Sequence, residues 1–237
     1  MAVCRRLGAM GASIALTATS ERVHDRVNEL EEAGVSAMGV VAGLADPAAP
    51  GELIAAVQDR WDRLDILVNN AGVISVTEDV GSSAGLPPLS YTEWQRSVRR
   101  NVDTAFLMSR AALPMMRRGA WGRIVMVASV TGPVTAMRDD EAYAAAKAGM
   151  AGLAKSLAAH LAGERITANA VALGWIASGS QTQDEGHEGD VTPLGRSGSV
   201  DEVAWPVVWL CAPAAAYVTG QCLVVDGGNR VAEARRV

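Results

Sequence analysis

Three side chains could together move a proton: the hydroxyls of Ser129 and Tyr143 and the ammonium of Lys147. Tyr143 and Lys147 are four residues apart, which places both on one face of a helix. A phenol titrates at about 10, and a positive charge nearby lowers that pKa by favouring the phenolate. We therefore expect the pair to exchange a proton near neutral pH. Ser129 ends an apolar run, where its hydroxyl could hydrogen-bond the oxygen of a carbonyl or an alcohol.

The competing interpretation of this spacing is a packing residue followed by a solvated charge. The chain has three tyrosines but only two lysines, Lys147 and Lys155. A chance pair four residues apart is therefore rare, and the scarcity of lysine favours the functional interpretation.

The elements that must position these side chains alternate along the chain. Short apolar runs predict strands at 13–18, 37–42, 65–69, 123–128, 166–172 and 222–225. Helical patterns cover 2–10, 21–33, 46–61, 92–118, 141–161 and 200–210, the fourth interrupted near Pro114. Segments 73–90 and 174–199 are predicted loops. Continuously apolar strands between helices indicate one α/β domain, 1–237, with a parallel sheet covered on both faces.

Polar or small residues follow several of these strands. Asn70, Ser129, Gly174 and the segment that starts at Thr19 each come just after a strand end. Ligands on parallel sheets bind beyond the carboxyl ends of the strands. We therefore expect these residues to converge on one cleft.

Composition argues against several function classes. The net charge is −5 and no basic patch is present, so we expect no nucleic acid and no anionic membrane as partners. No apolar run approaches the roughly 18 residues of a membrane span. The three cysteines are scattered, which is typical of a reduced cytoplasmic protein. With only three histidines, we expect no metal site.

The ordered motifs of the chain resemble the short-chain dehydrogenase/reductase family, in the form typified by 3-oxoacyl-(acyl-carrier-protein) reductases. The resemblance covers nearly the whole chain and rests on Asn69-Asn70-Ala71-Gly72, Asn101, Ser129, Tyr143-x-x-x-Lys147 and Val225-Asp226-Gly227-Gly228. It implies a Rossmann-like, doubly wound parallel sheet in three layers. It also implies hydride transfer between a nicotinamide cofactor and a ketone/secondary-alcohol pair of a small-molecule substrate.

The same resemblance assigns roles to four catalytic residues. Tyr143 would be the general acid in carbonyl reduction and the base in alcohol oxidation. Lys147 would lower the Tyr143 pKa and hold the nicotinamide ribose hydroxyls. Ser129 would hydrogen-bond the substrate oxygen, with a strand-end cap as its alternative role. Asn101 would hold a water of the proton relay, with a helix kink as its alternative.

Cofactor preference follows from the end of the second family strand. NAD-specific sheets place an acidic residue there, whereas this chain has Thr19, Ser20 and Arg22, and Glu21 belongs to the next helix. Hydroxyls and a guanidinium suit a 2′-phosphate, so NADP(H) is preferred and NAD(H) is the alternative. The expected cofactor-binding residues are Thr19, Ser20, Arg22, Leu44, Asn70, Ala71, Gly72, Tyr143, Lys147, Gly174, Ile176 and Ser178.

The family begins with a strand and a glycine-rich turn that binds pyrophosphate at a helix N-terminus, and the sequence contains neither. That strand is central, so its absence would leave a gap with unpaired backbone groups. Three explanations are open. The true start codon could lie upstream of Met1, the native N-terminal segment could be missing from the given sequence, or the fold could be remodelled and bind cofactor weakly. We expect the first. A truncated, non-catalytic paralogue with a binding or structural role is the main rival to an enzyme.

Segment 174–199 is expected to be the substrate lid, formed by Trp175 and residues 179–193. Its acidic residues give little reason to expect an anionic carrier-protein substrate: Asp184, Glu185, Glu188 and Asp190. The family commonly forms dimers and tetramers through its two long helices and last strand. We therefore expect a homodimer or a homotetramer.

Overall fold

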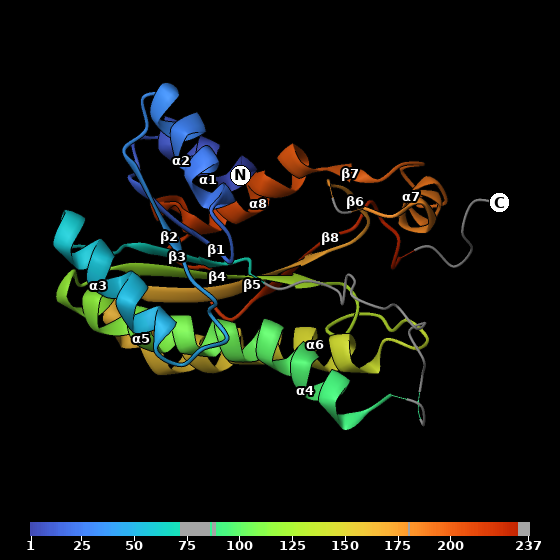
Figure 1. Ribbon diagram of the computed structural model, residues 1–237. Coiled ribbons are helices and arrows are strands. Elements are labelled where there is room, and N and C mark those ends of the chain that lie inside the picture. Colours follow the sequence, from blue (N-terminus) through green and yellow to red (C-terminus); the bar gives the residue numbers. More distant parts are fainter. Residues whose placement is uncertain (72–85, 87–88, 180, 232–237) are drawn as a thin grey trace.

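The computed structural model describes residues 1–71, 86, 89–179 and 181–231. Helices cover both faces of the sheet, which gives the expected three layers (Figure 1). One helical layer holds α1 (Ala2–Ala9), α2 (Arg22–Glu32) and α8 (Val200–Cys211). The other holds α3 (Ala49–Trp61), α5 (Thr104–Arg118) and α6 (Glu141–Leu161). The predicted α/β fold with a parallel sheet is confirmed.

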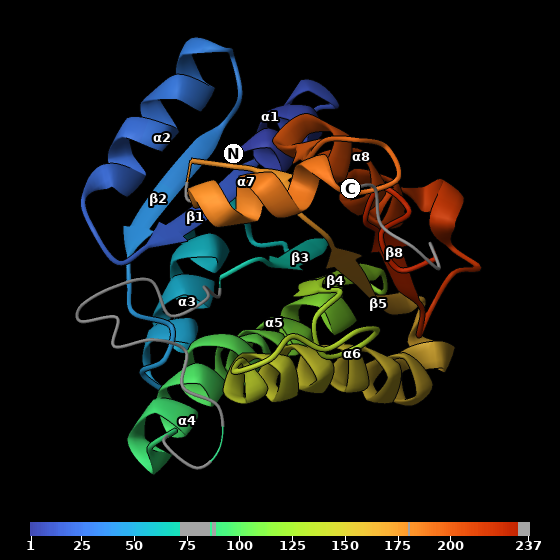
Figure 2. The same ribbon diagram turned by 90° about the vertical axis from the view of Figure 1, so that its right-hand side faces the viewer.

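The strands of the central layer form two separate parallel groups, and a short third pair lies between β5 and α8 in the sequence. Four of them pair in the order β3 (Ile66–Asn69), β4 (Gly122–Ser129), β5 (Ile166–Leu173) and β8 (Cys222–Val225). β1 (Ile14–Ala18) pairs only with β2 (Ala37–Val41), and Figure 2 shows both with α2 at one edge of the molecule. Among the described residues no backbone ladder joins the two groups. A sheet interrupted in this way is what the sequence analysis expects; the absent strand itself stays a prediction.

Burial explains why the central strands are continuously apolar. Neighbouring residues of a strand point to opposite faces of the sheet. Ile124 and Val125 of β4 are both fully buried yet belong to different hydrophobic clusters. Ile124 packs with α5 and α6 residues such as Met116 and Met150, whereas Val125 packs with α8 residues such as Val207. With a core on each face, β4 has no position for an alternating polar residue.

The helical pattern at 92–118 is broken at a different place from the one predicted. α4 (Tyr91–Val98) runs into a π-helical turn, η1 (Arg99–Asp103), before α5 begins. α5 continues through Pro114, which is exposed, so water can satisfy the carbonyl that the proline ring leaves without a donor. The interruption thus holds Asn101, the predicted site residue.

The prediction of a loop over 174–199 is wrong. Two short strands, β6 (Ile176–Ala177) and β7 (Gly198–Ser199), pair there, and α7 (Gln183–Asp190) lies between them. A reciprocal capping box starts α7, because Thr182 Oγ1 accepts from Glu185 N at 3.2 Å and Glu185 Oε2 accepts from Thr182 N at 2.8 Å. Its role as a substrate lid stays a prediction.

Two short 3₁₀ turns complete the described elements, η2 (Ala162–Glu164) and η3 (Pro213–Ala215). In the part of the chain that the structure describes, no helix is long and apolar enough to cross a bilayer. Nor do three or more histidine, cysteine, aspartate or glutamate side chains gather there as metal ligands would. The predicted loop 73–90 lies almost entirely outside the described residues.

Candidate active site

Helix α6 carries Tyr143 and Lys147 toward the end of β4. The Lys147 side chain is only 4% exposed, and its Nζ donates to the Val127 carbonyl at 3.2 Å. That Nζ lies 5.5 Å from the centre of the Tyr143 ring. The phenol and the ammonium therefore share one face of the helix, as their spacing predicts, and that face packs on β4.

Ser129 is the last residue of β4 and meets the Tyr143 phenol. The Ser129 hydroxyl is near enough to lower the pKa of the phenol, and Ser129 Oγ accepts from the Thr131 backbone N at 3.1 Å. The bond from Thr131 is the strand-end cap that is the alternative role for this serine. The cap leaves the hydroxyl proton available, because a hydroxyl oxygen has two lone pairs and one proton.

Asn101 is fully buried in the π-helical turn. Its Nδ2 donates to the Ser97 carbonyl at 3.0 Å, while its Oδ1 is buried without a hydrogen-bond partner among the described residues. The turn packs against α6, where Val102 approaches Gly149. Buried amide oxygens are almost always hydrogen-bonded, so this acceptor suits a water or a ligand group. The bond to Ser97 is also what the kink-stabilising alternative requires.

The electrostatics of this group differ from the sequence-based expectation. Burial raises the pKa of Tyr143 to about 12; the Ser129 hydrogen bond opposes the rise, and the charges of Asp140 and Glu185 add to it. Burial also lowers the pKa of Lys147 to about 8. In this structure the loss of hydration therefore shifts the pKa of the phenol in the direction opposite to the expected one. The role of Lys147 in lowering the Tyr143 pKa stays a prediction.

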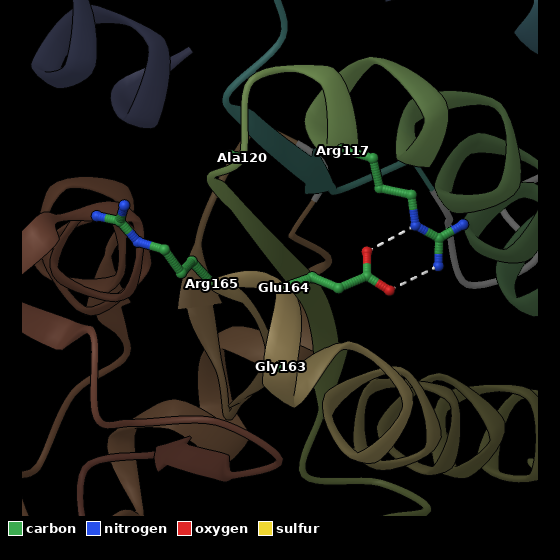
Figure 3. A pocket seen from close by; sticks show the side chains of 5 residues that line it. All are labelled: Arg117, Ala120, Gly163, Glu164 and Arg165. Carbon is green, nitrogen blue, oxygen red and sulfur yellow. Dashed lines mark hydrogen bonds and ion pairs between the residues drawn. The ribbon is translucent and has the colours of Figure 1, made fainter.

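Two surface cavities lie away from this group. One of about 320 Å³ is lined by Arg117, Ala120, Gly163, Glu164 and Arg165 (Figure 3). Arg117 and Glu164 form a bidentate ion pair across it, at 2.6 and 2.9 Å. It borders the starts of β4 and β5, whereas Ser129 ends β4. At roughly 3.3 Å per residue, some 20 Å of strand separates the two.

Comparisons with known proteins agree with this arrangement. A family model described as enoyl-(acyl carrier protein) reductase matches residues 1–230. The 3-oxoacyl-(acyl-carrier-protein) reductase FabG of Escherichia coli K12 is 35% identical over 233 residues, which is 96% of this chain and 91% of FabG. The chain belongs to the short-chain dehydrogenase/reductase family.

Two further relatives support that membership. The uncharacterized oxidoreductase YohF of Escherichia coli K12 is 36% identical over 236 residues, covering 95% of this chain and 89% of YohF. The crystal structure of a putative short-chain dehydrogenase/reductase from Burkholderia xenovorans has a TM-score of 0.89 at 29% identity, covering 98% of this chain and 89% of that one. This short-chain dehydrogenase/reductase is thus an enzyme that acts on CH–OH groups with NAD(P).

The residues expected to bind the cofactor come from both sheets of this short-chain dehydrogenase/reductase. Thr19 and Ser20 follow β1 and are exposed, as is Arg22 at the start of α2. Glu21 pairs with His24 at 3.2 Å, whereas Arg22 makes no ion pair among the described residues. One exposed turn thus carries two hydroxyl side chains and a guanidinium.

The remaining cofactor-side residues have mixed surroundings. Asn70 is exposed just after β3, with Ala71 beside it, and Gly72 lies outside the described residues. Leu44 is half-buried against the large core cluster, which gives it a packing role as well. Gly174 follows β5, and a Cβ there would meet Asp226 at 2.8 Å, so close packing alone requires a glycine. The last two, Ile176 and Ser178, lie in and just after β6.

One group that influences Tyr143 is not among the residues that the sequence predicts. Asp140 precedes Tyr143 by three residues and its charge reaches the phenol. The acidic run Asp139-Asp140-Glu141, which ends two residues before Tyr143, was the available signal. Glu185 was noted only as part of an acidic segment, because nothing in the sequence shows that α7 brings it near Tyr143.

Proposed function

We propose that this enzyme is an NADP(H)-dependent reductase of a small-molecule ketone, with Tyr143 as the proton donor. The observation that carries the proposal is the position of the buried Lys147 ammonium, 5.5 Å from the centre of the Tyr143 ring, where α6 packs on the β4 strand that Ser129 ends. Such a group is suited to holding a carbonyl oxygen and protonating it. The family matches favour this function over a non-catalytic role.

The proton chemistry favours reduction at neutral pH. With a pKa raised to about 12, the Tyr143 phenol is protonated at pH 7 and can give its proton to a developing alkoxide. Ser129 would hydrogen-bond the same substrate oxygen. Lys147 and the unpartnered oxygen of Asn101 would return a proton to the phenolate through water. The cofactor, when bound, supplies the hydride, and ketone, hydride and proton together give the secondary alcohol.

The cofactor would lie across the strand ends. Lys147 would hold the nicotinamide ribose hydroxyls, and Thr19, Ser20 and Arg22 the 2′-phosphate. The other expected contacts are Leu44, Asn70, Ala71, Gly72, Gly174, Ile176 and Ser178. Support for NADP(H) over NAD(H) comes from the contact of Glu21 with His24 at 3.2 Å, which gives the carboxylate next to Arg22 another partner.

Removal of the Tyr143 phenol tests the function. Tyr143→Phe is expected to lower kcat for ketone reduction by about a hundredfold or more, because general acid catalysis contributes at least that much. NADPH absorbance follows turnover on a ketone panel, and NADPH fluorescence follows cofactor binding, which the variant should retain. Tyr91→Phe, at a tyrosine that is 73% exposed, is the matched control.

Two outcomes would contradict the proposal at different levels. Full activity of Tyr143→Phe would refute the role of this residue while leaving the reaction intact. An unmodified protein that neither binds NADPH nor turns over any ketone would refute the reductase function itself.

We also propose a homodimer or homotetramer and a cytoplasmic location. Large apolar side chains are exposed on the outer helices, including Phe106 of α5 and Trp205 and Trp209 of α8. Contact between copies would cover such surfaces. Sedimentation velocity at several protein concentrations measures the assembly directly.

A further inference from the structure

The chain makes a tight turn over residues 130–135, directly after Ser129 ends β4. The turn is closed by a backbone hydrogen bond from Gly132 N to the Thr135 carbonyl at 2.8 Å. The Thr131 backbone N donates to Ser129 Oγ at 3.1 Å. The Ser129 hydroxyl is therefore tied to this turn, and a displacement of the turn would displace the hydroxyl with it.

Gly132 brings the turn against the backbone of α6. Its φ is 99°, a conformation in which a side chain is strained. A Cβ there would also lie 2.1 Å from the Ala144 carbonyl oxygen and 3.0 Å from the Ala148 backbone nitrogen. In an α-helix those two atoms are the acceptor and the donor of one hydrogen bond. Position 132 therefore requires glycine on two grounds, its conformation and its contact with the helix.

The contacted hydrogen bond belongs to the helical turn that carries the proposed proton donor. Ala144 directly follows Tyr143, and Ala148 directly follows Lys147. The same turn is held to β4 by Lys147, whose Nζ donates to the Val127 carbonyl at 3.2 Å. The spacing between the end of β4 and this part of α6 is thus fixed by close backbone contact, which cannot relax by a change of rotamer.

We propose that Gly132 is a positioning residue, whose contact with α6 sets the distance between the Ser129 hydroxyl and the Tyr143 phenol. The inference rests on the proposed reductase function and concerns the same site. One substrate oxygen must reach both hydroxyls, and a misplacement of about 1 Å can cost a hundredfold in rate. An alanine Cβ would force about that separation, because the 2.1 Å contact would have to open to at least 3.0 Å.

The kinetic test compares Gly132→Ala with two matched glycine variants. In folded protein, Gly132→Ala is expected to lower kcat for ketone reduction by about a hundredfold. Gly11→Ala adds a Cβ at a similar φ of 92° with no atom within 4 Å, so it carries the strain without the contact. Gly152→Ala adds a Cβ to α6 itself, again with no atom within 4 Å. Both controls should keep kcat within about twofold.

A double-mutant cycle separates positioning from general damage to the fold. If Gly132 acts by placing Ser129, then Gly132→Ala should lower kcat by less than about threefold in a Ser129→Ala background, because the hydroxyl is already absent. If Gly132→Ala only damages the fold, then the two losses should multiply, to about ten-thousandfold. A multiplicative result overturns the proposal.

Hydrogen exchange in the unmodified protein tests the contact even if Gly132→Ala does not fold. The amides of Gly132 and Thr135 report opening of the turn, because Gly132 N donates to Thr135 and Thr135 N donates to the Val130 carbonyl at 2.9 Å. A turn held against α6 should exchange as slowly as the buried helical amide of Met150, within about tenfold. Faster exchange of the turn, while Met150 stays protected, overturns the proposal.

Failure of this inference and failure of the proposed function give different results. If the unmodified protein reduces ketones and Gly132→Ala is equally active, then the positioning role is wrong and the reductase stands. If the unmodified protein reduces no ketone although the turn amides are protected, then the reductase function is wrong. The positioning role falls with it, and only the contact between the turn and α6 is upheld.

Discussion

The buried ammonium of Lys147 makes the stability of the protein depend on pH in a definite direction. Burial lowers its pKa from 10.5 to about 8, and no carboxylate among the described residues pairs with it. One pKa unit corresponds to about 1.4 kcal/mol, so the protonated side chain lowers the free energy of unfolding by about 3 kcal/mol. Below pH 8 both the folded and the unfolded chain carry the proton, and the full penalty applies. As the pH rises above 8 the folded chain loses it first, so stability increases toward pH 10.5.

Urea denaturation at pH 7 and pH 10 measures this effect in the unmodified protein and in Lys147→Met. Relative to the variant, the unmodified protein should gain about 2.5 kcal/mol of unfolding free energy between the two pH values. Other groups titrate alike in both proteins and cancel. The control is Lys155→Met, at an exposed lysine of the same helix. Its difference in unfolding free energy from the unmodified protein should be the same at both pH values. If the difference in unfolding free energy between Lys147→Met and the unmodified protein is equal at both pH values, the pKa of Lys147 is not lowered by burial.

Two further substitutions test the ends of the site. Arg22→Gln is expected to raise the Kd for NADPH about tenfold without changing the Kd for NADH, because a charge-assisted phosphate contact is lost. The control is Arg26→Gln, since the Arg26 guanidinium already pairs with Glu29. Equal weakening of NADPH and NADH binding would contradict the assignment of Arg22. Ser129→Ala is expected to lower kcat/KM by about a hundredfold. It should also raise the Tyr143 pKa, because the Ser129 bond lowers it; an alkaline phenolate titration that does not shift would count against that bond.

The sequence predicts the fold wherever one physical signal dominates. The apolar run at 123–128 and the helical pattern at 141–161 correspond to β4 and α6 almost residue for residue. The signal fails at 99–103, because a π-helical turn inserts a residue without any change in apolar pattern. It fails again at 183–190, where glycines and acids suggest a loop and the capping box that starts α7 extends over only four residues.

The sequence predicts which side chains of the candidate site lie together better than it predicts their pKa values. Spacing alone places Tyr143 and Lys147 on one face of a helix, and the strand end places Ser129 opposite them. The direction of the Tyr143 pKa shift depends on burial, which comes from the packing of α6 against β4 and leaves no mark on residue spacing. For the same reason the influence of Asp140 and Glu185 on the phenol emerges only in three dimensions.

The interrupted sheet leaves β1, β2 and α2 without a backbone ladder to the central strands among the described residues. β1, β2 and α2 enclose a hydrophobic cluster of their own, built on Ile14 and Leu30, and Leu7 of α1 packs against both this cluster and the one beneath α8. Side-chain packing rather than a backbone ladder thus holds the β1–β2 unit to the catalytic half, which makes its detachment a sub-global opening of low free energy. Arg22 lies on one unit and Lys147 on the other. A dinucleotide that contacts both residues would bind only while the two units are together. Its binding would therefore raise the free energy needed to open the β1–β2 unit.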